Sequence, residues 1–275
     1  MTSRIRLASV VKHAFLILVC LASVYPIWFI LQTSLKTNAD YTLSPLGLPL
    51  RSTASNYLEV IRSMPVPRWA WNSMIVTLTA ATLSTVIALP AGYAFTFGRF
   101  RGRSTLFNSN VAFMVVPPVA LLAPMFTLMV DVGLINHLPS VIIFYVGLFV
   151  PFSVFFMTNF MQTIPVELLE AAKMDGLSPL ATLRMIVTPL ASPALFTLML
   201  VNIIYGWNEL LIALVFLQDD SSRTLMAGLS VFQGRYVTQQ PLVMAGSFLS
   251  IVPILVLYTF GQRFFVKGLT AGIGK

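Results

Sequence analysis

Charged residues are scarce in this sequence, since Asp, Glu, Lys and Arg make up 9% of its 275 residues while 57% are hydrophobic. A soluble domain of this length needs far more charge to cover its surface. The scarcity therefore excludes an ordinary soluble globular protein and favours the lipid bilayer as the solvent. We expect one all-α integral membrane domain that extends over residues 1–275.

Cysteine and histidine are also scarce. Cys20 is the single cysteine, which excludes an internal disulfide framework and a zinc site built on cysteines and leaves the redox compartment open. The two histidines, His13 and His137, fall near predicted span ends, so we expect no metal site. Acidic residues number 9 against 17 Lys and Arg. The cations lie between apolar segments rather than on one basic face, so we expect no nucleic-acid partner.

The sequence also lacks a nucleotide-binding loop. The segment GRFRGRS at 98–104 has the wrong glycine spacing, has no Gly-Lys-Ser/Thr and follows no strand. No nucleophile, base and metal ligands converge at membrane depth, which argues against an intramembrane enzyme. We therefore expect no catalytic residues and no cofactor in this chain.

Long apolar runs are what the sequence has. A run of about 20 apolar residues crosses the bilayer as a helix. The candidate spans are 14–35, 72–97, 106–130, 140–160, 191–217 and 243–266. The first resembles a signal peptide, but it is long and lacks a small-x-small cleavage site, so we expect an uncleaved span. Pro117 and Pro118 are expected to kink or break the third span, because two backbone donors are missing.

The basic residues predict the orientation of these spans. Most of the 17 cations fall in the N-terminal segment, the 98–105 loop, the 161–190 loop and the C-terminal tail. With six spans, these four segments share one side of the membrane. The positive-inside rule then places both termini and the 161–190 loop in the cytosol.

The 161–190 loop is charged and punctuated by prolines. Pro165 suits the first turn of a helix, and Glu167 suits the positive end of its dipole. Glu170 can pair with Lys173, and Gly176 supplies a left-handed end. The expected apolar stripe consists of Ile164, Leu168, Leu169 and Ala172.

A second short helix is expected to follow directly. Ser178 caps it, Pro179 opens it and Pro189 closes it, after which Ser192 and Pro193 begin the fifth span. The result is a helix–turn–helix outside the bilayer. It can be a simple membrane-surface connection or a docking element that passes a push from a soluble partner into spans four and five.

Four segments of this sequence resemble one family. They are EAAKMDG at 170–176 with the following IVTPL, the second-span region NSMIVTLTAATLSTVIALPAGYAFTFGRFRGR, the WNELL of span five, and the tail QRFFVKGLTAGIGK. The chain resembles permeases of ATP-binding-cassette importers, in particular the shorter six-span subunit of the carbohydrate, maltose-type subfamily. It departs at Leu177, where alanine is usual, and at Thr188, where leucine is usual. Neither departure removes a charge or the turn glycine.

The resemblance implies a type I importer permease fold with a cytosolic EAA coupling loop. The coupling residues would be Glu170, Ala171, Ala172, Asp175 and Gly176. The implied partners are a second permease subunit in a heterodimer, two copies of a cytosolic ATPase that binds ATP and Mg²⁺, an extracytoplasmic sugar-binding protein, and membrane lipid. The implied location is the bacterial inner (plasma) membrane, crossed several times.

Polar residues interrupt the predicted fifth span at GWNELL. An ionisable group there is costly and usually faces the bundle interior, a partner or water. Trp207, Asn208 and Glu209 could line a sugar path, with Trp207 as a stacking platform, or could bond the fifth span to a neighbouring helix. Both interpretations stay open.

An ion-gradient-driven secondary transporter is the alternative function. Six spans, one membrane-embedded acid and no detectable inverted repeat argue against it. The sequence does not identify the sugar or polyol.

Overall fold

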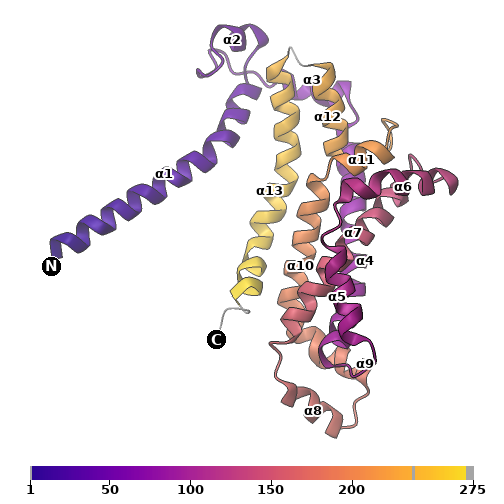
Figure 1. Ribbon diagram of the computed structural model, residues 1–275. Coiled ribbons are helices and arrows are strands. Elements are labelled where there is room, and N and C mark those ends of the chain that lie inside the picture. The colour runs from indigo at the N-terminus through magenta and orange to yellow at the C-terminus, as the bar shows by residue number, and fades with distance from the viewer. Residues whose placement is uncertain (1, 237–238, 271–275) are drawn as a thin grey trace. The chain divides into compact units, whose positions relative to one another are not determined.

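The computed structural model describes the backbone of residues 2–236 and 239–270, and the side chains of residues 9–259 except 235, 237 and 238. Within these ranges the chain is helical, and no strand is present (Figure 1). It forms two compact units: residues 1–66 with 229–253, and residues 67–228 with 254–275. The all-α prediction is confirmed.

The helices follow one another with short connections. In the first part of the chain they are α1 (Thr2–Ser34), α2 (Asn38–Leu43), α3 (Ser55–Ser63), α4 (Val66–Phe97), α5 (Arg103–Phe113), α6 (Pro118–Asp131) and α7 (Leu138–Met161). In the second part they are α8 (Val166–Met174), α9 (Pro179–Thr182), the π-helix η1 (Leu183–Val187), α10 (Thr188–Asn208), α11 (Leu211–Phe216), α12 (Leu225–Arg235) and α13 (Gln240–Thr270).

The predicted spans correspond to helices that are long and apolar enough to cross a membrane. Five of them are Ser9–Ser34, Val66–Phe97, Leu138–Met161, Pro179–Asn208 and Gln240–Thr259. The third predicted span is a bent pair, α5 and α6, at an angle of 94°. The bend lies at Pro117 and Pro118, where two amide donors are missing, so the predicted break is confirmed.

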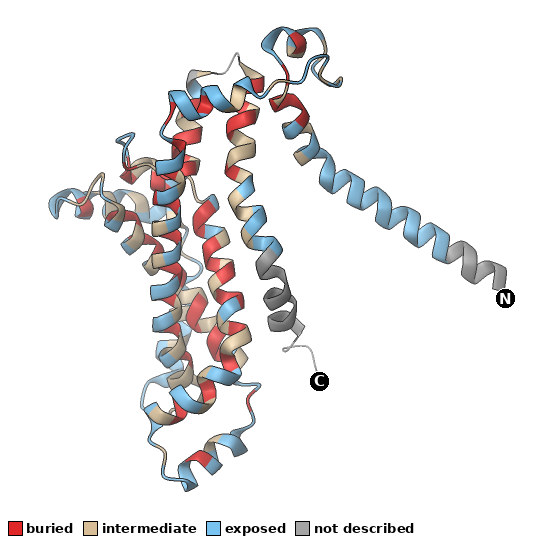
Figure 2. Cartoon of the chain, turned by 180° about the vertical axis from the view of Figure 1, so that it is seen from behind, coloured by how far each residue is buried: buried red, intermediate tan, exposed pale blue. Residues whose placement is uncertain are grey.

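In the first unit, residues 9–26 of α1 are exposed, and this stretch of the ribbon is pale blue in Figure 2. The loop after α1 is well packed by contrast. Lys36 is completely buried there, and its Nζ donates to the carbonyls of Ser44 (2.9 Å) and Pro45 (3.0 Å). A buried ammonium group needs such partners, so Lys36 fixes the fold of this loop.

The second unit has two apolar clusters along its length. One joins α4, α6, α7 and α11; the other joins α4, α7, η1 and α10. Figure 1 shows α8 and α9 at one end of this unit and α6 and α11 at the other. The first cluster is Val76, Ala80, Met129, Val141, Phe144, Tyr145, Phe149, Ile212, Phe216 and Leu217. The second is Ala88, Val154, Met157, Met161, Ile164, Leu183, Val187, Ala191, Ala194 and Leu198.

The start of the fifth span differs from the prediction. No helix closes at Pro189, and no new helix opens at Ser192 and Pro193, because the helix runs without interruption from Pro179 to Asn208. The π-helix of residues 183–187 precedes Pro189, and the wider turn lets the helix continue past a residue that has no N–H to donate. The Thr188 hydroxyl donates to the Leu183 carbonyl at 2.7 Å across this wider turn.

Candidate functional site

Helix α8 carries the EAA residues and ends in a defined turn. Gly176 has φ +77°, so the predicted left-handed end is confirmed. The Gly176 N–H donates to the Lys173 carbonyl (3.1 Å), and the Leu177 N–H donates to the Ala172 carbonyl (3.0 Å). These two bonds form a Schellman motif, which satisfies carbonyls at the end of the helix and fixes the direction in which the chain leaves it.

Most of the predicted coupling residues lie on the surface. Glu170, Ala171, Asp175 and Gly176 are exposed, whereas Ala172 is buried. Ala172 therefore packs α8 against its own chain, and the neighbouring exposed residues are the ones that a partner can reach.

Two details of the predicted helix are wrong. Leu168 was placed on the buried stripe but is 42% exposed, whereas Leu169 packs against the apolar cluster near α8. The predicted pairing of Glu170 with Lys173 is absent from the ion pairs of the described residues. Both side chains are exposed, so water competes for each charge and the pair gains little.

The loop also exposes large apolar side chains that the sequence analysis did not predict. These side chains alternate with the charged ones of α8 and continue onto α9 and η1. They are Val166, Leu168, Met174, Leu180 and Met185, of which Met174 is 87% exposed. The elements that carry them contact one another in sequence, α8 with α9 and α9 with η1, and exposed large apolar side chains of this kind are one feature of protein–protein contact surfaces.

The second half of the loop is joined rigidly to the fifth span. The Ser178 hydroxyl accepts from the Ala181 N–H at 3.3 Å, so the predicted N-cap is present. Pro179 then opens the helix that continues through η1 into α10. Only residues 175–178 therefore separate α8 from the helix that continues into the membrane.

At its other end the fifth span breaks at Glu209 and Leu210. The Glu209 carboxylate accepts backbone N–H groups from Leu211 (3.0 Å), Ile212 (3.1 Å) and Ala213 (3.3 Å), so it caps α11. The Tyr145 hydroxyl of α7 also donates to this carboxylate, at 2.9 Å. In a membrane helix the amide groups at a break need such partners, because lipid supplies none. Glu209 therefore holds the broken span together.

The other two residues of the predicted path lie in different surroundings. Trp207 is buried, with 6% of its surface exposed, which leaves little of its ring for a sugar. Asn208 is exposed, and its Nδ2 donates to the Ile204 carbonyl of its own helix (2.8 Å). Tyr205, one turn earlier, is also exposed and makes an edge contact with Phe149. Asn208 and Tyr205 are thus the exposed polar side chains of α10.

Tyr145 is the partner of Glu209 that sequence reasoning missed. It is fully buried, and 64 positions separate it from Glu209. Its hydroxyl in an otherwise apolar span is a weak signal, because a tyrosine in such a run is also common at membrane interfaces. The bond between Tyr145 and Glu209 forms only because α7 packs against the break between α10 and α11.

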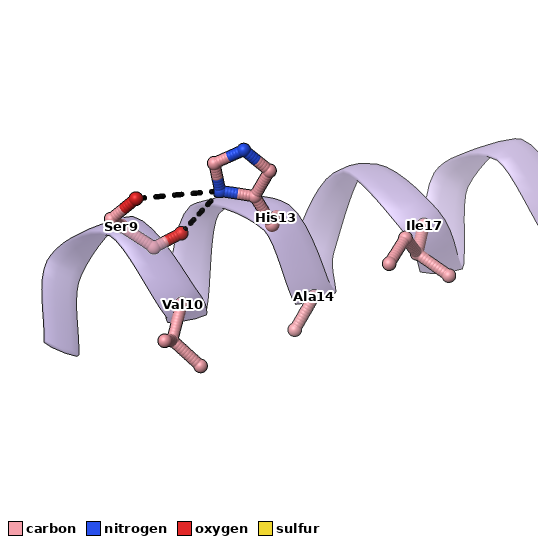
Figure 3. Close-up of a pocket in the computed structure, with 5 residues that line it drawn as sticks. All are labelled: Ser9, Val10, His13, Ala14 and Ile17. Atoms are coloured by element: carbon pink, nitrogen blue, oxygen red, sulfur yellow. Dashed lines mark hydrogen bonds between the residues drawn. The ribbon is translucent and has the colours of Figure 1, made fainter. Parts of the chain in front are cut away.

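Neither a metal centre nor a catalytic cavity is evident where the chain is described. Three His, Cys, Asp or Glu side chains do not gather at any point of the described residues. A shallow pocket runs along α1 beside Val10, Ala14 and Ile17 (Figure 3). Its polar edge is His13, whose Nδ1 lies 2.7 Å from the Ser9 carbonyl. This feature is one side of a single helix and carries no chemistry.

A family model matches residues 84–270 of this chain, and it describes the binding-protein-dependent transport system inner membrane component. Similar curated proteins extend the match towards the N-terminus. The sulfoquinovosyl glycerol transport system permease protein SmoH of Agrobacterium fabrum is 32% identical, over 90% of this chain and 87% of that protein. The trehalose/maltose transport system permease protein MalG of Thermococcus litoralis is 31% identical, over 94% of each. The melibiose/raffinose/stachyose import permease protein MelC of Bacillus subtilis is 29% identical, also over 94% of each.

Solved structures agree with the helical arrangement. A chain of a bacterial ABC transporter involved in the import of the acidic polysaccharide alginate matches with a TM-score of 0.80 and 27% identity, over 94% of this chain and 97% of that chain. A chain of the MetNI methionine ABC transporter matches with a TM-score of 0.56 and 21% identity, over 78% of this chain and 99% of that chain. The second match concerns the fold alone.

Proposed function

Because this chain belongs to the family of binding-protein-dependent transport system inner membrane components, we propose that it forms half of the path for a sugar or related polyol. The chain is a multi-pass membrane protein and a permease subunit of an ATP-binding-cassette importer. The proposal concerns its cargo, its coupling to a partner ATPase and the composition of its complex.

The names of the relatives support a carbohydrate cargo. They refer to sulfoquinovosyl glycerol, to trehalose and maltose, and to melibiose, raffinose and stachyose, and the structural match concerns alginate. All of these are sugars or sugar derivatives rich in hydroxyl groups. Asn208 is the exposed amide in the fifth span that can bond such groups, and we assign it to the path. Trp207 is buried and Glu209 caps α11, so we assign both to holding the span in place rather than to contact with cargo.

The exposed surface of α8 is the observation that carries the coupling role. Glu170, Ala171 and Gly176 lie there, next to Leu168 and Met174. A groove on a cytosolic ATPase of the family would receive this surface, and the continuous helix from Pro179 would pass its movement to α10. Ala172 takes part by packing α8 in place. Asp175 lies at the C-terminal cap of α8, beside the turn.

The proposed orientation places α8 and both termini in the cytosol of a bacterium. Support comes from the cations in the segments on that side, including Arg99, Arg101 and Arg103 in one short loop. The tail cations Arg263, Lys267 and Lys275 lie outside the residues whose side chains the structure describes. ATP and Mg²⁺ would bind to the partner ATPase.

Transport by a reconstituted complex tests the function. The cargo is first identified by thermal-shift screening of the cognate binding protein. ATP-dependent uptake of that compound into vesicles, unchanged when ion gradients are collapsed, is the expected result. Uptake that follows an imposed ion gradient without ATP would establish the secondary-transporter alternative instead.

The first prediction concerns assembly. Because this chain supplies part of a path, we expect a complex with one copy of this chain, one different permease and two ATPase subunits. Native mass spectrometry of the gently solubilised complex measures this composition. A homodimer of this chain that transports sugar without a second permease would contradict it.

The second prediction concerns the end of α12. Gln233 is exposed there, and the proposed orientation places it outside, where a binding protein arrives. A photoreactive probe on Gln233→Cys, within the stretch 233–236, is expected to cross-link to the binding protein during turnover. The same probe on Met185→Cys, exposed on η1, is the control and should not reach that protein. Labelling of position 233 from the cytosol alone would overturn the orientation.

A further inference from the structure

The first turns of α4 hold a segment that lies far away in the sequence, residues 218–228. Trp69 is 1% exposed, and its Nε1 donates to the Asp220 carbonyl at 2.6 Å. A Cβ at Gly228 would overlap the Trp69 ring, so the ring packs directly on the backbone there. One indole thus contacts the segment near its beginning and at its end.

Two polar side chains on the same face of α4 add further bonds. The Asn72 Nδ2 donates to the carbonyls of Ser221 (3.1 Å) and Arg223 (2.9 Å). The Ser73 hydroxyl accepts from the Leu225 N–H at 2.8 Å. Asn72 and Ser73 lie three and four positions after Trp69, on the same side of the helix. All three side chains therefore bond the same segment, residues 218–228.

A fourth side chain fixes the segment from the connection between α6 and α7. The Asn136 Oδ1 accepts from the N–H groups of Gln218 (2.7 Å) and Asp219 (3.1 Å), and the Asn136 N–H donates to the Phe216 carbonyl (2.9 Å). Asn136 has φ +64°, the one positive φ of a non-glycine residue within the described part of the chain. Asparagine tolerates this left-handed conformation better than other residues with a Cβ, so Asn136 can turn the chain here while its side chain bonds the segment.

These four side chains are called the clamp: Trp69, Asn72, Ser73 and Asn136. Three of them are buried. Burial of an indole N–H, an amide and a hydroxyl is costly unless each is bonded, and here each is bonded to the backbone of the 218–228 segment. These bonds hold the segment against α4 and against the connection between α6 and α7.

We propose that the clamp residues are positioning residues that make the 218–228 segment move with α4 as one body. The segment then meets its partner as a preformed surface, and a movement of the second span changes the position of that surface. The identity of the partner, the soluble binding protein, rests on the proposed function. The clamp itself rests on the hydrogen bonds of its four side chains to the segment.

Two variants remove single parts of the clamp. Trp69→Phe keeps a ring against Gly228 but loses the N–H, and Asn136→Gly keeps the left-handed backbone but loses the side-chain oxygen. Trp71→Phe is the matched control, because Trp71 is two residues away on the same helix and 61% exposed. Asn136→Asp retains an acceptor oxygen and should restore most of what Asn136→Gly loses.

Two measurements are made on the reconstituted complex with its purified, cargo-loaded binding protein. Hydrogen–deuterium exchange within 218–228 is expected to rise about fivefold for each bond removed. The binding-protein concentration for half-maximal ATPase stimulation is expected to rise by a similar factor, about fivefold, with less change in the maximal rate. Trp71→Phe should match the unmodified protein in both.

The outcomes separate the clamp from the proposed function. Unchanged exchange in Trp69→Phe and Asn136→Gly would overturn the clamp. Faster exchange with an unchanged half-maximal concentration would overturn its positioning role. If the binding protein does not stimulate the unmodified complex, the proposed function fails, while exchange still decides whether the clamp holds the segment.

Discussion

Gly176→Val is expected to abolish most ATP-driven uptake while membrane insertion stays intact. A Cβ at Gly176 would meet no atom within 4 Å, so the effect comes from the backbone alone. At φ +77° a residue with a Cβ is strained by about 1–2 kcal/mol, and a β-branched one is the least tolerated. Relief of this strain would rotate α8 and displace the surface that meets the ATPase.

Matched variants separate the turn from the surface. Gly176→Asn is expected to keep most uptake, because asparagine tolerates the left-handed conformation. Glu170→Lys leaves the turn intact and reverses an exposed charge on α8, so ATPase association should fall. Ser178→Ala loses a cap worth ~1 kcal/mol and should be milder.

Uptake and ATPase hydrolysis are measured on the same vesicles. Hydrolysis without uptake, or loss of the ATPase from the complex, is expected for both Gly176→Val and Glu170→Lys. Normal uptake by both variants would mean that the 161–190 loop is only a connection between spans.

Glu209→Ala is expected to lower both the thermal stability of the permease and its uptake. The carboxylate accepts N–H groups from the first turn of α11 and the hydroxyl of Tyr145. Each polar group left without a partner at a buried site costs about 1–3 kcal/mol. Loss of the Glu209 carboxylate leaves several of these groups without a partner at once, so we expect the break in the fifth span to become less ordered.

Two comparisons make this prediction specific. Tyr145→Phe removes one donor and keeps the cap, so its effect on stability should be smaller. Asn208→Ala removes a bond to the same helix only, so stability should change little, whereas uptake should fall if Asn208 lines the path. Melting of the purified permease and uptake by vesicles are the measurements. A Glu209→Ala variant that melts at the same temperature as the unmodified protein would contradict the capping role.

The sequence alone predicted the features that depend on local backbone chemistry. Pro117 and Pro118 lack amide donors wherever they lie, Gly176 tolerates a positive φ that other residues resist, and Ser178 before Pro179 is a local cap. Each effect depends on one or two turns of backbone. For the same reason, apolar runs of membrane-crossing length gave the spans.

Tertiary structure decided the features that depend on which residues of other helices pack against a given side chain. Leu168 and Leu169 are the same residue type at adjacent positions, and only packing against the neighbouring helices determined which one is buried. Pro189 does not end its helix, because a π-helix before it keeps the chain helical. Glu209 meets Tyr145, and Trp69 meets Asp220, across separations for which the sequence holds no local rule. Hydrogen bonds act over about 3 Å, so these pairs exist only because packing brings distant helices together.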